Sequence, residues 1–91
     1  MTVMVDELKP YLYPNQRVPP GYWCHLTCDG DVEELHRFAK RIGCRRSWFQ
    51  DHPGHPHYDL TSGRRTRALQ LGAVFVPAKE QARRRLEVQR G

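Results

Sequence analysis

The sequence predicts an α/β domain: a small single-domain sandwich of about four mostly parallel strands with three helices. The first observation behind this prediction is that apolar, strand-like segments alternate along the chain with stretches of helical periodicity. The second is the length of 91 residues, which suffices for one modest core and leaves no room for a second. Because helical crossovers join parallel strands, the alternation favours a largely parallel sheet. We therefore expect residues 1–91 to form one α/β domain.

Four segments have the composition of strands: 3–5, 22–28, 57–60 and 73–76. Segment 3–5 is apolar throughout and predicts a strand that is buried on both faces. In segment 22–28, alternation places Cys24 and Leu26 on one face and His25 on the other. Between the first two strands, residues 10–20 hold four prolines and predict an irregular loop.

Three segments are predicted to be helical. Residues 31–43 repeat apolar side chains at helical spacing, with Asp31 suited to the N-cap and Gly43 to the position after the last turn. Thr61 or Ser62 can cap a short helix that ends before Gly72. Residues 78–91 predict a basic C-terminal helix with a thin apolar stripe.

Positive charge is concentrated in the second half of the chain. The net charge is +5, but residues 1–43 hold five Lys/Arg against six Asp/Glu, and residues 44–91 hold ten against four. This asymmetry indicates an anionic partner, either nucleic acid or a phosphate group, with Arg83, Arg84 and Arg85 as candidate nucleic-acid contacts. The alternative is a solvated basic helix with no such partner.

The sequence also bounds the cellular environment. No apolar run approaches the roughly 18 residues of a membrane span, and the first residues lack the pattern of a signal peptide. Three cysteines, an odd number, argue against a disulfide framework. We therefore expect a cytoplasmic protein that makes no membrane contact.

The segment 52–60, which reads His-Pro-Gly-His-Pro-His-Tyr-Asp-Leu, is the strongest candidate for a functional site. It holds three of the five histidines of the chain together with an aspartate. Alternation in an extended chain points His57 and Asp59 to the same side, and His55 joins them if the chain stays extended through Pro56. Their side chains can then converge on one ligand.

Three chemistries fit this cluster, and the residues alone do not select among them. His55, His57 and Asp59 can bind a divalent transition metal, the one cofactor that the sequence suggests. His57 with Asp59 can act as a catalytic acid–base pair, assisted by His55 and His25. A phosphate can lie beside the helix that starts near Ser62, in contact with Arg64 or Arg65.

The alternative is that the histidine segment is only a rigid turn, since no standard zinc, phosphate-loop or hydrolase motif accompanies it. Four further residues are candidate substrate contacts. Asp6 follows the first strand, Trp48 and Gln50 precede the cluster, and His52 begins it.

The residues resemble a known family. The opening Met-x-Val-x-Val-Asp, the pair Cys24-His25, the triplet Trp48-x-Gln50 and above all segment 52–60 are similar to an uncharacterised family of small bacterial and phage proteins, catalogued as a domain of unknown function. The resemblance covers nearly the whole chain. It implies a bacterial or phage origin and no established activity. The positions it singles out are Asp6, His25, Trp48, Gln50, His52, His55, His57 and Asp59.

Two classes of function therefore remain open. The first is an enzyme-like domain with a His/Asp site that acts on a phosphate-bearing substrate such as a nucleotide or nucleic acid. The second is a non-catalytic binding protein that contacts nucleic acid or a host protein through its basic C-terminal half. The sequence selects no oligomeric state for either.

Overall fold

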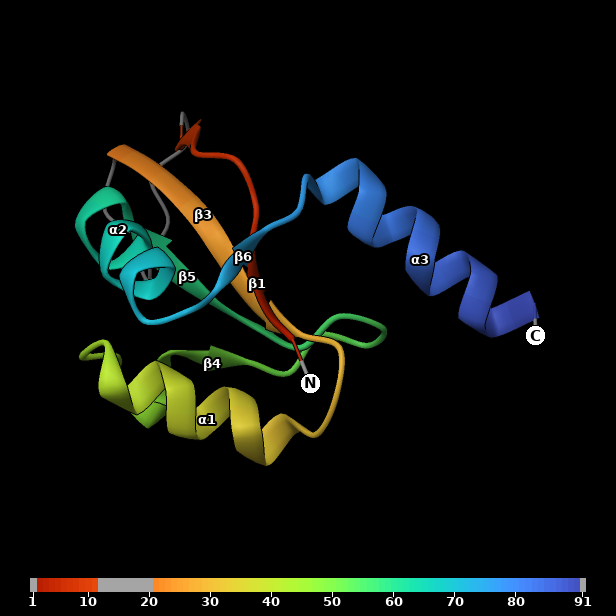
Figure 1. Ribbon diagram of the computed structural model, residues 1–91, viewed down its shortest axis with the longest axis horizontal. Helices are drawn as coiled ribbons and strands as arrows, with labels where there is room; N and C mark the ends of the chain where they lie inside the picture. The colour runs from red at the N-terminus through yellow and green to blue at the C-terminus, as the bar shows by residue number, and fades with distance from the viewer. Residues whose placement is uncertain (1, 12–20, 91) are drawn as a thin grey trace.

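The computed structural model describes residues 2–11 and 21–90, and these form one twisted mixed sheet with helices on both sides (Figure 1). The strands are β1 (Val3–Val5), β2 (Lys9–Tyr11), β3 (Gly21–Cys28), β4 (Phe49–Gln50), β5 (His57–Thr61) and β6 (Val74–Phe75). The helices are α1 (Val32–Arg41), α2 (Ser62–Gln70) and α3 (Ala78–Arg90), with a 3-10 turn η1 (Arg46–Trp48) before β4.

The sheet has the strand order β4-β5-β3-β1-β6, and β2 also pairs with β3. The predicted α/β class is confirmed, but the prediction of mostly parallel strands was wrong. Among the described strands only β1 and β6 are parallel, whereas β3 pairs antiparallel with β1, β2 and β5, and β4 pairs antiparallel with β5. The alternation of strands and helices misled the prediction because α1 does not return the chain for a parallel crossover. After α1 the chain runs through β4 into β5, which lies antiparallel to β3.

Strand β2 is a second departure, since it includes Pro10 and Tyr11 of the predicted irregular loop. Within residues 2–11 and 21–90 it pairs with β3 alone, and proline is tolerated on an outer strand because its missing N–H interrupts no second ladder of hydrogen bonds. Residues 12–20, the rest of that loop, lie outside the described part of the chain.

Strands β1 and β2 run along the same side of β3 with a change of register between them. Val5 is opposite Leu26, but Lys9 is opposite Trp23. The segment that joins β1 to β2 therefore contains one residue more than the part of β3 that it faces. This offset falls next to Asp6, whose carboxylate Oδ1 accepts a hydrogen bond from the backbone N–H of His25 at 2.6 Å. At this irregularity the N–H of His25 is bonded to the side chain of Asp6, whereas the backbone carbonyl of Asp6 accepts from Arg65.

The two faces of the sheet differ in what covers them. Helices α1 and α2 pack on one face, where Leu35, Phe38 and Ala68 meet the buried side chains of β1, β3 and β5. We call the opposite side the open face. There, α3 touches the sheet through Gln81, whose side chain accepts a hydrogen bond from Thr27 at 2.7 Å and donates one to the carbonyl of Val76 at 2.8 Å. Figure 1 shows the rest of α3 extending away from the body.

Each helix begins where a capping group is available. Asp31 caps α1 by accepting from the N–H of Glu33, and Thr61 caps α2 by accepting from the N–H of Arg64. For α3 the cap comes from far away in sequence, because Glu7 accepts from the N–H of Ala78 at 2.7 Å. Among residues 2–11 and 21–90, no helix is long and apolar enough to cross a membrane.

Candidate functional site

A row of polar side chains crosses the open face of the sheet from β4 to the end of β1. We call it the polar row and define it as Gln50, His57, Asp59, His25 and Asp6. Strand pairing explains its composition, because Gln50 lies opposite His57 and His25 lies opposite Asp59. Residues that face each other across two strands have their side chains on the same face. Three strands and the residue that follows β1 therefore contribute to one continuous polar patch.

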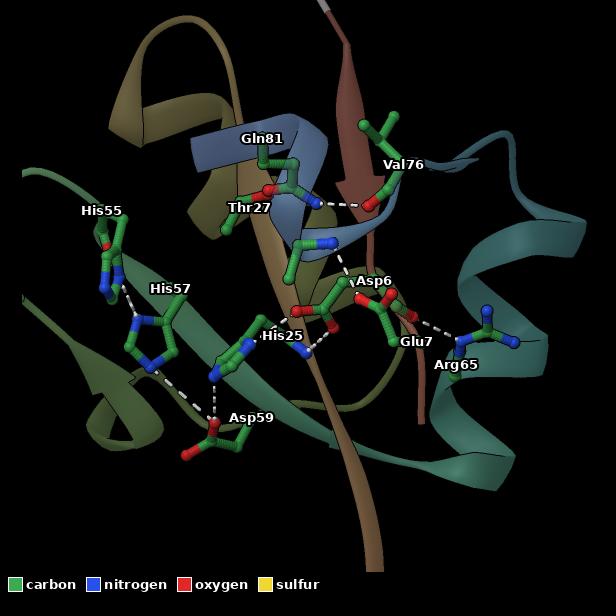
Figure 2. Close-up of polar contacts among 11 residues, drawn as sticks. Asp6, Glu7, His25, Thr27, His55, His57, Asp59, Arg65, Val76 and Gln81 are labelled. Atoms are coloured by element: carbon green, nitrogen blue, oxygen red, sulfur yellow. Dashed lines mark hydrogen bonds and ion pairs between the residues drawn. The ribbon is translucent and has the colours of Figure 1, made fainter. Parts of the chain in front are cut away.

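Three members of the polar row converge on one point, as Figure 2 shows. Nε2 of His25 lies 3.8 Å from Oδ1 of Asp59, and Nε2 of His57 lies 3.7 Å from the same oxygen. One ligand atom from each of the three residues falls within 4.8 Å of the others. Both nitrogen–oxygen distances are too long for a hydrogen bond. The three groups thus face one another without bonding directly.

In each of these three side chains, the polar atom that faces away from the point of convergence forms a hydrogen bond with another group. Asp6 Oδ2 lies 2.7 Å from Nδ1 of His25, and the backbone carbonyl of His55 lies 2.9 Å from Nδ1 of His57. A carbonyl and an ionised carboxylate only accept, so both Nδ1 atoms carry a proton, and the Nε2 atom of each ring is an acceptor when that ring is neutral. Gln50 donates a short hydrogen bond to Oδ2 of Asp59, which leaves Oδ1 facing the histidines.

The surroundings shift the pKa values of the two histidines in opposite directions. For His25, the hydrogen bond to Asp6 raises the pKa above 6.5 and outweighs the effect of partial burial. For His57, whose side chain is only 5 % exposed, burial lowers the pKa below 6.5. Burial opposes ionisation of Asp6, but the hydrogen bonds from the ring and backbone of His25 outweigh it and lower its pKa. His57 is therefore a neutral imidazole at neutral pH.

This geometry has the features of a metal-binding site. Two imidazole Nε2 atoms and one carboxylate oxygen are ligands that suit Zn, Fe and Mn. Metal-bound histidines usually donate their other N–H to a carboxylate or a backbone carbonyl, and Asp6 and the carbonyl of His55 fill these two roles. The site would use three protein ligands and leave coordination positions open for water or a substrate.

The three residues that converge in the structure are not the three that lie closest together in the sequence. His25 joins His57 and Asp59 in the converging set, in place of His55, which the sequence predicts as the third metal ligand. His55 still lies next to His57, with the two Nδ1 atoms 3.3 Å apart, and contributes its backbone carbonyl. His52 stacks on His55 at a ring-centroid distance of 5.1 Å and is exposed.

Three further candidates lie away from the converging set. Arg64 stacks over Trp48, with its guanidinium carbon 4.9 Å from the ring centroid. Arg65 donates from Nε to the backbone carbonyl of Asp6 at 3.0 Å and thus supports the polar row from behind. Both arginines belong to α2, which packs on the covered face. Their predicted role as phosphate contacts stays a prediction.

The three consecutive arginines of α3, Arg83 to Arg85, have separate environments. Arg83 forms ion pairs with Glu80 and Glu87, and Arg84 forms one with Glu80 at 3.3 Å. Arg85 is half-buried and lines the cavity next to His25. Nucleic-acid binding by this arginine run stays a prediction, and the acidic neighbours on α3 reduce the positive charge that it presents.

Sequence reasoning missed the part that α3 contributes near the site. Lys79 and Gln81 line the same cavity as His25, and Thr27 and Gln81 fix the helix there. A signal was available, because Ala78, Gln81 and Arg85 follow helical spacing and share one face of α3. Between Ala78 and Arg85 the side chains of that face are small or polar, so the apolar pattern of the helix does not indicate its contact with the sheet.

Comparisons with known proteins assign the family. The family model described as "Protein of unknown function (DUF4031)" matches residues 3–88. The chain belongs to this family. The match takes in every strand of the described structure and all of α1 and α2, so the polar row lies within the family's domain. No curated protein matched this chain, and no solved structure did.

Proposed function

We propose that the chain binds a divalent transition metal through Nε2 of His25, Nε2 of His57 and Oδ1 of Asp59. The observation that carries this proposal is their convergence without direct hydrogen bonds, at 3.7 and 3.8 Å. Two ligands on one ion, each bonded at 2.0–2.2 Å, are separated by roughly 3.0–3.6 Å. The two nitrogen–oxygen distances therefore have to shorten by only a few tenths of an ångström, starting from ligand atoms that all lie within 4.8 Å of one another.

The charge of the site also favours a divalent cation. Asp59 is a ligand with one negative charge, and Asp6 adds a second behind His25. His57 supplies a neutral ring, because burial lowers its pKa. Two carboxylates thus balance the two positive charges of the ion, which makes its partial burial acceptable.

The open coordination positions suggest what the metal does. A metal with three protein ligands can bind a water molecule, lower the pKa of that water and polarise a substrate oxygen. We propose that the substrate carries a phosphate group, in keeping with the excess of positive charge in residues 44–91. The reaction class is then metal-assisted attack of water on a phosphate ester.

The test is the metal content of untagged protein, measured by elemental mass spectrometry, together with the melting temperature with and without a chelator. We expect about one equivalent of Zn, Mn or Fe and a melting temperature that falls when the chelator removes it. His57→Ala and Asp59→Asn should lose both the metal and the response to chelator.

The matched control is His52→Ala, which removes an exposed histidine outside the converging set and should keep the metal. Urea denaturation of each metal-free variant separates loss of metal binding from loss of folding. Wild-type protein that binds none of the three metals, or a metal that survives in folded Asp59→Asn and disappears in His52→Ala, would overturn the proposal.

A further inference from the structure

A cavity of about 340 Å³ lies between α3 and the polar row. Asp6, His25 and His55 line it from the sheet side, and Lys79, Gln81 and Arg85 line it from α3. His25 belongs both to this cavity and to the converging metal-ligand set. A group bound in the cavity would therefore contact a residue that is also a proposed ligand of the metal.

The two cations of this cavity have no competing partner. Within the described residues, the side chains of Lys79 and Arg85 form no ion pair or hydrogen bond, whereas Arg83 and Arg84 are paired with Glu80. Arg85 is also half-buried, so water screens its charge less than it screens an exposed arginine. The cavity thus holds two positive charges that are available to a ligand.

The charges define the class of ligand. Asp6 and Asp59 balance a divalent metal, so the metal-loaded site would leave the charges of Lys79 and Arg85 uncompensated. A phosphate monoester carries a charge of about −1.5 to −2 at pH 7 and has three acceptor oxygens for such cations. A volume of about 340 Å³ is at the lower end of small-ligand sites, which suits one phosphate group with a small substituent.

We infer that this cavity is a phosphate-binding subsite in which Lys79 and Arg85 hold the phosphate group against the metal at His25. The inference rests on the proposed function for the metal, and it adds the residues and the ligand class on the α3 side. Because metal and phosphate attract each other there, each should raise the affinity of the other by the same factor. Thr27 and Gln81 act as positioning residues, since their hydrogen bond holds α3 at the cavity.

The experiment is a calorimetric titration of inorganic phosphate into the full-length protein, loaded with the metal that it retains and, separately, treated with chelator. We expect binding to the metal-loaded wild type to be at least roughly tenfold tighter than to the metal-free protein. Replacing one charge-assisted contact by Arg85→Gln or Lys79→Gln should weaken phosphate binding roughly tenfold. Metal stoichiometry should be unchanged in both variants, because neither residue is a proposed ligand.

Arg83→Gln is the matched control, since it removes an arginine of the same helix that is paired with glutamates. It should leave phosphate affinity unchanged. Equal phosphate affinity in Arg85→Gln and Arg83→Gln, or no phosphate binding by the metal-loaded wild type, would overturn the subsite and leave the metal proposal standing. If the wild type retains no metal, the metal proposal fails, and the metal-free titration decides the subsite alone. Binding that Arg85→Gln weakens would support it, and no binding would overturn it.

Discussion

The same two strands present opposite chemistry on the two faces of the sheet. On the face covered by α1 and α2, β3 and β5 contribute Cys24, Leu26, Tyr58 and Leu60, all exposed by 2 % or less. On the open face, the intervening residues of the same strands are His25, His57 and Asp59. Alternation along a strand thus separates the residues that fold the protein from those that can bind a ligand.

The covered face also holds a histidine, which is bonded to a core side chain. The hydroxyl of buried Tyr58 lies 2.8 Å from Nδ1 of His36 on α1, so this histidine has a structural partner. On the open face the two Nε2 atoms of the polar row remain without a hydrogen bond to Asp59. His25 and His57 are also bonded through Nδ1, so what distinguishes them is that their two Nε2 atoms face one carboxylate oxygen of Asp59.

The largest expected effect comes from the covered face. Leu26→Ala should lower the free energy of unfolding by about 2–5 kcal/mol, because it opens a cavity in a fully buried position. Urea denaturation of the metal-free protein measures it. Val88→Ala, at a residue that is 79 % exposed, is the control and should change stability by less than about 0.5 kcal/mol. Equal effects of the two variants would contradict the division between the faces.

The docking of α3 gives the next effect. Thr27→Val keeps the shape of the side chain but leaves the buried Oε1 of Gln81 without its donor. The free energy of unfolding, measured by urea denaturation, should fall by roughly 1–3 kcal/mol. Thr66→Val removes a hydroxyl that is exposed on α2 and serves as the control. A Thr27→Val protein as stable as the Thr66→Val protein would show that this hydrogen bond does not hold α3 on the open face.

Asp6 should affect the metal more than the fold. Asp6→Asn weakens the orientation of the His25 ring and should lower metal affinity by roughly 10- to 100-fold, as is usual when the group behind a ligand is changed. A competition titration with a chromophoric chelator measures this. Asp29→Asn, which changes an exposed aspartate that accepts from the N–H of Thr2, should leave affinity unchanged. The role of Asp6 would be refuted if both variants bound the metal like the wild type.

The smallest effect is the pH dependence of the pair formed by Asp6 and His25 in metal-free protein. The lowered pKa of Asp6 contributes stability that is present above its ordinary value of 3.8 and is lost as the pH falls through the folded-state value. The raised pKa of His25 contributes stability that is present below 6.5 and is lost as the pH rises through its folded-state value. The melting temperature of the wild type should therefore exceed that of Asp6→Asn by the largest amount between pH 3.8 and pH 6.5, where both contributions are present. A difference that is constant from acid to alkaline pH would refute the pair.

The sequence predicted the two-sided character of the strands better than their arrangement. Alternation correctly separated Leu26 from His25, and helical periodicity located α1 to within a few residues. The direction and order of the strands depend on long-range pairing, such as β3 with β5, which local patterns do not contain. Strand β2 was not predicted because it contains Pro10, and a proline argues against a strand unless the strand is known to be at an edge.

The candidate site was partly predictable for the same reason. His57 and Asp59 are two residues apart in one strand, so their common orientation follows from local geometry alone. The place of His25 opposite Asp59 requires the register between β3 and β5, and the contact of Asp6 with His25 requires the offset between β1 and β2. Lys79 and Arg85 come to the site only through the tertiary contact between Gln81 and Thr27.

The central claim is that the open face binds one metal ion at His25, His57 and Asp59. The most direct measurement is a crystal structure of the metal-loaded protein with data collected at the absorption edge of that metal. The account predicts one anomalous peak at roughly 2.0–2.2 Å from the two Nε2 atoms and from Oδ1 of Asp59. A crystal with no peak there, or with its strongest peak on His52 and His55, would contradict it.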